Sequence, residues 1–176
     1  MNTDKLFADL TATVQEMLLK LDAPAMQLNL NYPLPTLQRL LQTSLAGEAL
    51  LQTLTAAFEA LQPLYGKLTV RDEGDGLFCL TVPQQGAAYM LSHGGSADFL
   101  RELIAAVKVH ASMQEVLAVF SRHGRVHAEQ IDNPEFEWLV YFEDGQPDSC
   151  RYCLSQHAGH VSYHRFAKED YEAFGF

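Results

Sequence analysis

Residues 135–166, EFEWLVYFEDGQPDSCRYCLSQHAGHVSYHRF, decide the fold because two turns within them fix the register of three strands. Ala158-Gly159 suits a two-residue hairpin turn, since glycine accepts a positive φ without strain. This turn predicts the cross-strand pairs His157–His160, Ser155–Ser162, Leu154–Tyr163 and Cys153–His164. The loop DGQPD, residues 144–148, suits a five-residue connection. It predicts the further pairs Phe142–Cys150, Val140–Tyr152 and Trp138–Leu154.

The two registers agree, because together they place the large apolar side chains on one face of the sheet. These residues are Phe136, Trp138, Val140, Phe142, Cys150, Tyr152, Leu154, Val161 and Tyr163. A slip of one residue would scatter them over both faces, so the pattern specifies the pairing. The opposite face then carries Glu135, Glu137, Leu139, Tyr141, Arg151, Cys153, Ser155, His157, His160, Ser162 and His164. We expect an antiparallel meander with an apolar face on the core and a face rich in imidazoles, hydroxyls and acids.

Helical periodicity dominates the first third of the chain. Residues 3–21 repeat apolar side chains at the three-four spacing of an amphipathic helix, and the same spacing predicts helices over 36–45 and 50–61. Residues 22–35 contain three prolines and are interpreted as a connector.

The period changes to two at residues 66–83, where EGDG between two alternating runs predicts a β-hairpin. Residues 87–93 are a candidate third strand. Ser96 is a candidate N-cap for a helix that carries an apolar stripe from Phe99 to Val107, and a break near Ala111-Ser112 precedes a further apolar stripe.

Strands that cluster apart from helices favour an α+β fold over a doubly wound parallel sheet. We expect N-terminal helices, then a mostly antiparallel β-sheet with a C-terminal meander of three or four strands packed against helices. Residues 1–46 are interpreted as a helical N-terminal extension, which can belong to the same domain, and residues 47–176 as the α+β domain.

The composition is that of a folded, acidic protein. Apolar residues make up 48% of the chain and charged residues 19%, which is typical of globular proteins and not of disorder. The formal net charge of −10 disfavours nucleic acid and anionic membranes as partners and favours a basic protein. Neither a signal peptide nor a membrane-spanning run is visible, so a cytoplasmic location is expected.

Glu135, His157 and His160 form the sharpest candidate site. In the predicted register they lie in one row across neighbouring strands, which are about 4.8 Å apart. Two imidazoles and a carboxylate can hold Zn²⁺ or Fe²⁺ with open coordination positions, or act as general acid and base without a metal. The competing interpretation is a solvated polar face, and we favour it because Glu135 follows Pro134 and can fall outside the strand.

The three cysteines offer weaker hypotheses. Their odd number argues against a disulfide framework. Cys150 and Cys153 point to opposite faces of a strand, and no second cysteine pair completes a zinc site. Cys153 opposite His164 resembles a thiolate with its base, although no oxyanion hole is visible in the sequence. Cys79 is expected to be a buried small apolar residue.

Two further segments bear on ligand binding. His93-Gly94-Gly95-Ser96 before a helix can present amides to an anion, although ordinary helix capping is favoured. The one basic cluster can bind an anion, neutralise a helix C-terminus or pair with the acidic stretch 129–148; it comprises Arg122, His123, Arg125 and His127. Residues 129–148 carry seven carboxylates and no basic residue, which makes them the best candidate for attracting a basic partner.

No motif of a known family stands out, and three hypotheses about function remain open. The first is a non-enzymatic, acidic, cytoplasmic protein-interaction module of a chaperone-, inhibitor- or immunity-like kind, with a protein partner and with apolar N-terminal helices available for homodimer contacts. The second is a metal-dependent or acid–base enzyme that uses the His/Glu row. The third is a binder of a small anionic ligand at the basic cluster and the Gly94-Gly95 turn.

Overall fold

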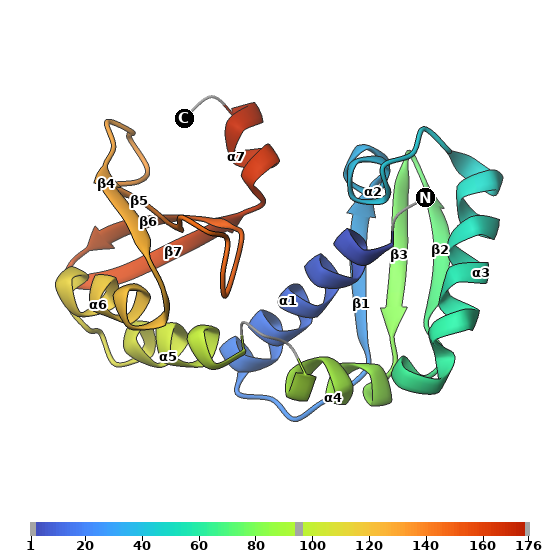
Figure 1. The fold of residues 1–176 in the computed structure, drawn as a ribbon, viewed down its shortest axis with the longest axis horizontal. Helices are drawn as coiled ribbons and strands as arrows, with labels where there is room; N and C mark the ends of the chain where they lie inside the picture. Colours follow the sequence, from blue (N-terminus) through green and yellow to red (C-terminus); the bar gives the residue numbers. More distant parts are fainter. Residues whose placement is uncertain (1–2, 94–96, 175–176) are drawn as a thin grey trace. The chain divides into compact units, whose positions relative to one another are not determined.

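The computed structural model describes residues 3–93 and 97–174, and its helices and strands are shown in Figure 1. The expected α+β class is confirmed. The N-terminal part combines helices with a three-stranded antiparallel sheet, and the C-terminal part contains a four-stranded antiparallel sheet. The chain divides into two compact units, Met1–Gly94 and Gly95–Phe176. The boundary expected between residues 46 and 47 lies inside the first unit. None of the helices in the described ranges is long and apolar enough to span a bilayer.

The first unit combines four helices with a three-stranded sheet of order β1-β3-β2, in which both pairings are antiparallel. Its elements are α1 (Asp4–Leu21), β1 (Leu28–Pro33), α2 (Leu34–Leu41), α3 (Gly47–Tyr65), β2 (Thr69–Gly74), β3 (Leu77–Val82) and α4 (Gln84–His93). The apolar stripe of α1 is buried in one core together with the inward-facing side chains of β1 and β3. Residues before position 47 therefore share the core of the sheet.

The connector predicted for residues 22–35 is wrong over β1. Leu28, Leu30 and Tyr32 alternate with exposed residues and are buried against β3, so this short run has the period of a half-buried strand. The prolines permit the strand because Pro24 precedes it, while Pro33 closes an edge strand, where a missing N–H costs no ladder bond.

The third strand predicted for residues 87–93 is also wrong, because these residues belong to α4. Ala87 and Met90 are three positions apart and fully buried on one face of the helix. The buried Gln15 amide of α1 donates a hydrogen bond of 2.7 Å to the Met90 carbonyl oxygen, which ties the two helices together. A short apolar run does not distinguish a buried strand from a buried helix, and tertiary packing decides here.

The second unit contains the predicted meander. Its elements are α5 (Ala97–Lys108), α6 (Met113–His123), β4 (Val126–Gln130), β5 (Trp138–Phe142), β6 (Arg151–His157), β7 (His160–Phe166) and α7 (Lys168–Phe174). The sheet order is β4-β5-β6-β7, with every neighbouring pair antiparallel. All four pairs predicted for the β6–β7 hairpin are confirmed, as are Val140–Tyr152 and Trp138–Leu154. The predicted Phe142–Cys150 pair lies outside the ladder, because β6 begins at Arg151.

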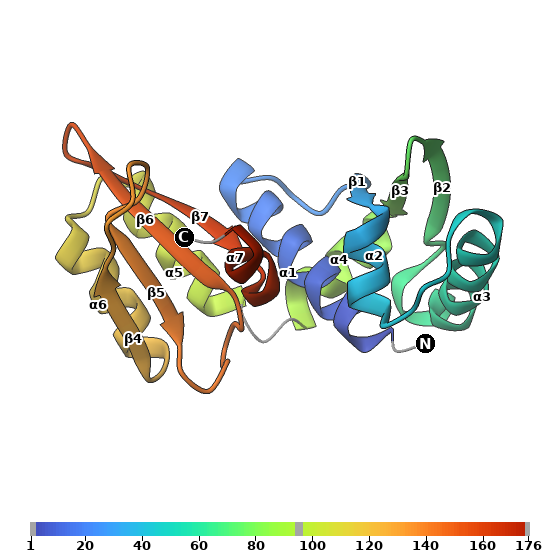
Figure 2. The ribbon, with the colours of Figure 1, turned by 90° about the horizontal axis from the view of Figure 1, so that it is seen from above.

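Helices α5 and α6 lie side by side against one face of this sheet (Figure 2). Four buried aromatic rings from two helices and two strands meet there edge to face, namely Phe99, Phe120, Phe142 and Tyr152. Such ring pairs add to the free energy of burial by roughly 0.5–1.5 kcal/mol each. This aromatic core fixes the sheet on its helices.

The opposite face of the meander is not simply polar. Leu139 and Cys153 are buried there with Phe136, and Tyr171 of α7 packs against them. The prediction that Phe136 lies on the inner face is therefore wrong. The physical reason is a turn at Asn133, whose side-chain oxygen accepts hydrogen bonds from the backbone N–H groups of Glu135 and Phe136. The turn interrupts the period of two before β5 begins.

Candidate functional site

Two turns of the second unit bring histidines together at one corner. The β6–β7 turn at Ala158-Gly159 has φ values of 50° and 83°, both positive as a type I′ turn requires. It places His157 directly opposite His160 in the ladder. Both imidazoles are exposed, so the corner is open to solvent.

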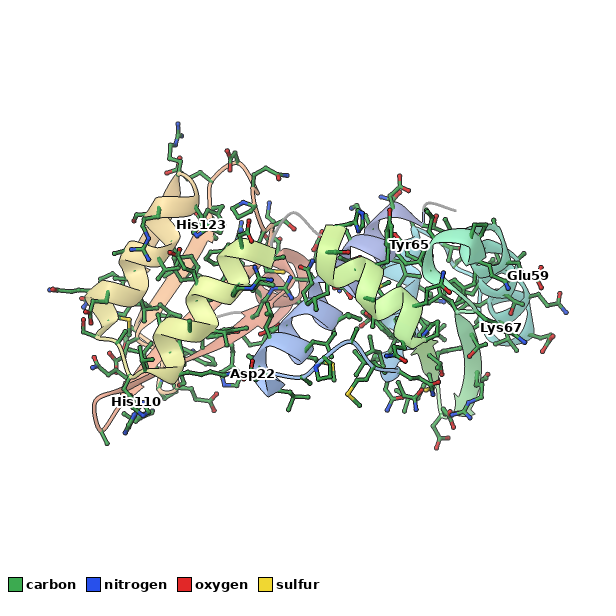
Figure 3. All side chains as sticks on the ribbon, turned by 90° about the horizontal axis from the view of Figure 1, so that it is seen from below. Asp22, Glu59, Tyr65, Lys67, His110 and His123 are labelled. Atoms are coloured by element: carbon green, nitrogen blue, oxygen red, sulfur yellow. The ribbon has the colours of Figure 1, made fainter. Side chains whose placement is uncertain are left out.

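His110, which the sequence analysis missed, completes this corner from the α5–α6 connection (Figure 3). Its Nδ1 atom lies 2.5 Å from the Nδ1 atom of His160, and the two ring centroids are 4.0 Å apart. The contact joins residues 50 positions apart in the chain. We call His110 and His160 the histidine pair.

The backbone holds His110 in place through the C-terminal cap of α5. The N–H of His110 donates to the carbonyl of Val107 at 3.1 Å, and the N–H of Ala111 donates to the carbonyl of Ala106 at 3.0 Å. These two bonds are those of a Schellman cap, in which the residue at His110 takes a left-handed conformation. Its φ is 58°, a conformation that glycine usually supplies.

Glu135 lies in the turn before β5 and not in the ladder, so the strand register does not bring it to this corner. Across residues 3–93 and 97–174, no group of three or more His, Cys, Asp or Glu side chains is arranged to hold a metal ion. The structure therefore brings His157 and His160 together, as predicted, but does not assemble them with Glu135 into a ready set of three ligands.

Cys153 and His164 are cross-strand partners, as predicted. The Cys153 side chain is completely buried, and burial raises the pKa of its thiol to about 11. The thiol is therefore protonated at neutral pH, which is the opposite of an activated nucleophile. The His164 ring instead packs against Phe136, with centroids 5.3 Å apart.

Each member of the basic cluster faces a carboxylate. Glu102 contacts both His123, at 2.6 Å, and Arg122, at 3.3 Å. The hydrogen bond from His123 and the contact with Arg122 lower the pKa of Glu102. Arg125 pairs with Glu143, and His127 lies 3.4 Å from Glu129. Arg125 and His127 thus pair with carboxylates of the stretch 129–148, as one of the predicted alternatives states, whereas Arg122 and His123 pair with Glu102 of α5.

The segment 129–148 divides into paired and unpaired acids. Asp148 is buried, accepts a hydrogen bond from the Tyr152 hydroxyl at 2.9 Å, and lies 2.9 Å from the Arg165 guanidinium. In the described part of the chain, Asp132 and Glu135 have no basic partner and are exposed. The glycines of the His93–Ser96 segment and Ser96 itself, which make up the predicted cap or anion site, lie outside the described residues.

A groove of about 250 Å³ in the first unit was not predicted from the sequence. Helix α3 forms one wall and residues 67–70 the other. Phe58 and Leu68 form a buried apolar floor, and the exposed Glu59 and Lys67 stand at the rim (Figure 3). Strand β2, beside the groove, is an edge strand that pairs only with β3 among the described strands. No periodicity reveals such a groove, because it depends on how a helix packs beside a sheet.

Comparison with known families matches residues 3–175 with the family described as "Domain of unknown function, E. rectale Gene description (DUF3877)". No curated protein and no solved structure gives a significant match. Since the family match covers nearly the whole of the 176 residues, the chain belongs to the DUF3877 family.

Proposed function

We propose that this chain is a non-enzymatic, cytoplasmic protein-interaction module that binds an extended, basic segment of a partner protein in the groove between α3 and β2. The observation that carries the proposal is the groove itself, which α3 and residues 67–70 line and which reaches the start of the edge strand β2. Binding at such a place uses main-chain hydrogen bonds for affinity and side-chain pockets for selectivity.

An added strand fits the chemistry of both walls. On its open side, β2 offers the backbone N–H and C=O groups that β3 does not use. Every second side chain of a strand paired with β2 faces the same side, so these side chains can reach the apolar floor at Phe58 and Leu68. Six residues match the length of β2, which is about 20 Å.

Charge selects the kind of segment. Helix α3 carries Glu48 and Glu59 but no Lys or Arg. At the far end of β2 lie Asp72 and Asp75, whereas Arg71 is already engaged by the Glu73 carboxylate at 2.7 Å. The net charge of −10 adds a long-range attraction for a cationic segment and a faster encounter at low salt.

The same charges suggest an orientation. A segment antiparallel to β2 ends near Thr69, beside the Lys67 ammonium, and begins near Asp72. Among the described residues Lys67 forms no ion pair, so it is available for a carboxylate of the partner. Basic residues are therefore expected where the bound segment passes Glu59 and Asp72, and an acidic group at its C-terminal end beside Lys67.

The competing hypotheses have less support. An anion-binding basic cluster is weakened by the carboxylates that face each of its members. A thiolate enzyme at Cys153 is weakened by the burial of that side chain. An interaction module needs neither an anion-binding cluster nor a reactive thiolate. It needs an edge strand and a groove that accepts side chains of the partner.

Panning the purified chain against a random octapeptide library tests the proposal, with fluorescence polarisation of the selected peptides at several salt concentrations. We expect basic, extended peptides whose affinity falls with salt. Glu59→Lys should weaken their binding at least tenfold by removing an attraction at the rim, and Thr55→Trp should do so by filling the groove. Both positions are exposed on α3, so the fold should tolerate the changes.

Glu48→Lys is the matched control, because Glu48 is an exposed acid of the same helix that does not line the groove. If Glu48→Lys weakens binding as much as Glu59→Lys, general charge and not the groove is responsible, and the proposal fails. It fails equally if Thr55→Trp binds the selected peptides as well as the unaltered chain.

A further inference from the structure

We infer that the histidine pair is a binding site for a divalent cation of borderline softness, with Zn²⁺ as the first choice. The site stands on observations in the second unit and is independent of the groove proposed as the peptide site. It differs from the predicted Glu135 row in that His110 replaces the carboxylate.

The two Nδ1 atoms face each other closely enough to share a proton or a metal ion. At 2.5 Å the separation is shorter than an ordinary hydrogen bond that involves a ring nitrogen. When the two rings take opposite tautomers, the Nδ1–H of one donates to the Nδ1 atom of the other, and when both Nδ1 atoms are unprotonated, their lone pairs face each other. In the second case, a metal ion between the nitrogens accepts both lone pairs.

The surroundings favour imidazole ligation. In the described ranges neither ring forms an ion pair with a carboxylate, so no acidic side chain competes with a metal ion for the ring nitrogens. Imidazole nitrogen is a preferred ligand of Zn²⁺, Ni²⁺ and Cu²⁺, whereas Mg²⁺ and Ca²⁺ prefer oxygen. The chemistry of the donors thus points to the later first-row metals.

The geometry needs only a small adjustment. Two Zn–N bonds of about 2.0–2.1 Å at a tetrahedral angle hold their nitrogens roughly 3.3 Å apart, so the rings must separate by less than about 1 Å. Both side chains are exposed and can rotate by this amount, and water can fill the remaining positions. His157, opposite His160 in the ladder, is the nearest candidate for a third protein ligand.

The backbone carries the pair on two fixed turns. His110 occupies the left-handed position of a Schellman cap at φ 58°, where a glycine would fit with less strain. His160 follows a turn in which Ala158, at φ 50°, is also left-handed. A residue kept in a strained conformation at an exposed corner suggests a role for its side chain. Here that role is to present the Nδ1 atom of His110 to His160.

The experiment is a zinc titration of the full, untagged chain by calorimetry at pH 7.5, together with ¹⁵N spectra of the histidine rings. We expect one Zn²⁺ per chain and a metal-induced shift of the Nδ1 resonances of His110 and His160. His110→Asn and His160→Asn should each weaken binding at least tenfold, and asparagine at position 110 tolerates the left-handed backbone. Mg²⁺ should give no binding.

His164→Asn is the control, because His164 is an exposed histidine of the same strand with a different neighbour. It should leave zinc affinity unchanged. The inference is overturned if the double variant His110→Asn/His160→Asn binds zinc as tightly as the unaltered chain, or if zinc leaves both Nδ1 resonances in place. Either result would mean that the pair shares only a proton. Peptide binding in the groove is measured without metal, so the two proposals can fail separately.

Discussion

Burial decides which cysteine thiol of this chain can react. Cys153 is fully buried with a pKa raised to about 11, Cys79 is buried, and Cys150 is only half-buried in the loop before β6. We expect Ellman's reagent at pH 8 to modify one thiol of the native chain rapidly, that of Cys150, and the other two only in denaturant. Cys150→Ser should remove the rapid phase. Rapid labelling of Cys153 would contradict the assignment of that residue to a packed cluster.

The sequence predicts the positions of some residues near the candidate site but not of others. The turn at Ala158-Gly159 is a local determinant, so the pairing of His157 with His160 could be predicted from it. His110 could not, because its contact with His160 depends on how α5 packs on the sheet 50 residues away. The misplacement of Phe136 has a local cause, the Asn133 side chain, whose preference for capping a turn was available in the sequence.

A capping box formed by Ser112 and Glu115 stabilises the N-terminal end of α6. The Ser112 hydroxyl accepts a hydrogen bond from the Glu115 N–H at 3.3 Å, and the Glu115 carboxylate accepts one from the Ser112 N–H at 2.8 Å. Hydrogen bonds from the Ser112 side chain and backbone lower the pKa of Glu115. Because its pKa is lowered in the folded state, this carboxylate stabilises the fold fully at pH values above the pKa that Glu115 has in the unfolded chain. The contribution is lost as the pH falls through the lower pKa of the folded state.

Ser112→Ala should therefore lower the free energy of unfolding by about 1 kcal/mol at pH 7, the usual cost of losing such a cap. It should also raise the pKa of Glu115 toward that of an ordinary glutamate. Urea unfolding and an NMR titration of the Glu115 side chain measure the two effects. Ser121→Ala is the control, because that hydroxyl donates only to the Leu117 carbonyl within the same helix. An unchanged Glu115 pKa in Ser112→Ala would show that the capping box does not form.

Elements were predictable where periodicity and turn chemistry agree. The β2–β3 hairpin is confirmed, with Asp75 and Gly76 at positive φ in its turn. Strand β1 was hidden by the prolines around it, although its alternation of Leu and Asn was present in the sequence. Helix α4 is short and apolar, and its packing against α1 and α3 selects a helix over a strand. In both cases the sequence does not reveal which element packs against the apolar side chains.

At the scale of the whole molecule, the chain has two separate cores. The first unit buries the leucine-rich stripe of α1 against its sheet, and the second buries Phe99, Phe120 and their aromatic neighbours. The only tryptophan, Trp138, belongs to β5 of the second unit. Its fluorescence therefore reports on one unit, whereas far-ultraviolet circular dichroism reports on the helices of both.

Two cores within one chain are expected to unfold in more than one step, because cooperativity is strongest within a single core. In urea, the fluorescence transition and the circular dichroism transition should fail to coincide. Leu10→Ala removes a fully buried side chain of α1 and should cost the first unit about 2–5 kcal/mol without moving the fluorescence midpoint. Phe120→Ala should lower the fluorescence midpoint, at a cost of about 3–5 kcal/mol to the second unit. Coincident transitions that both variants shift equally would mean that the units unfold as one, because each core would then depend on the other for its stability.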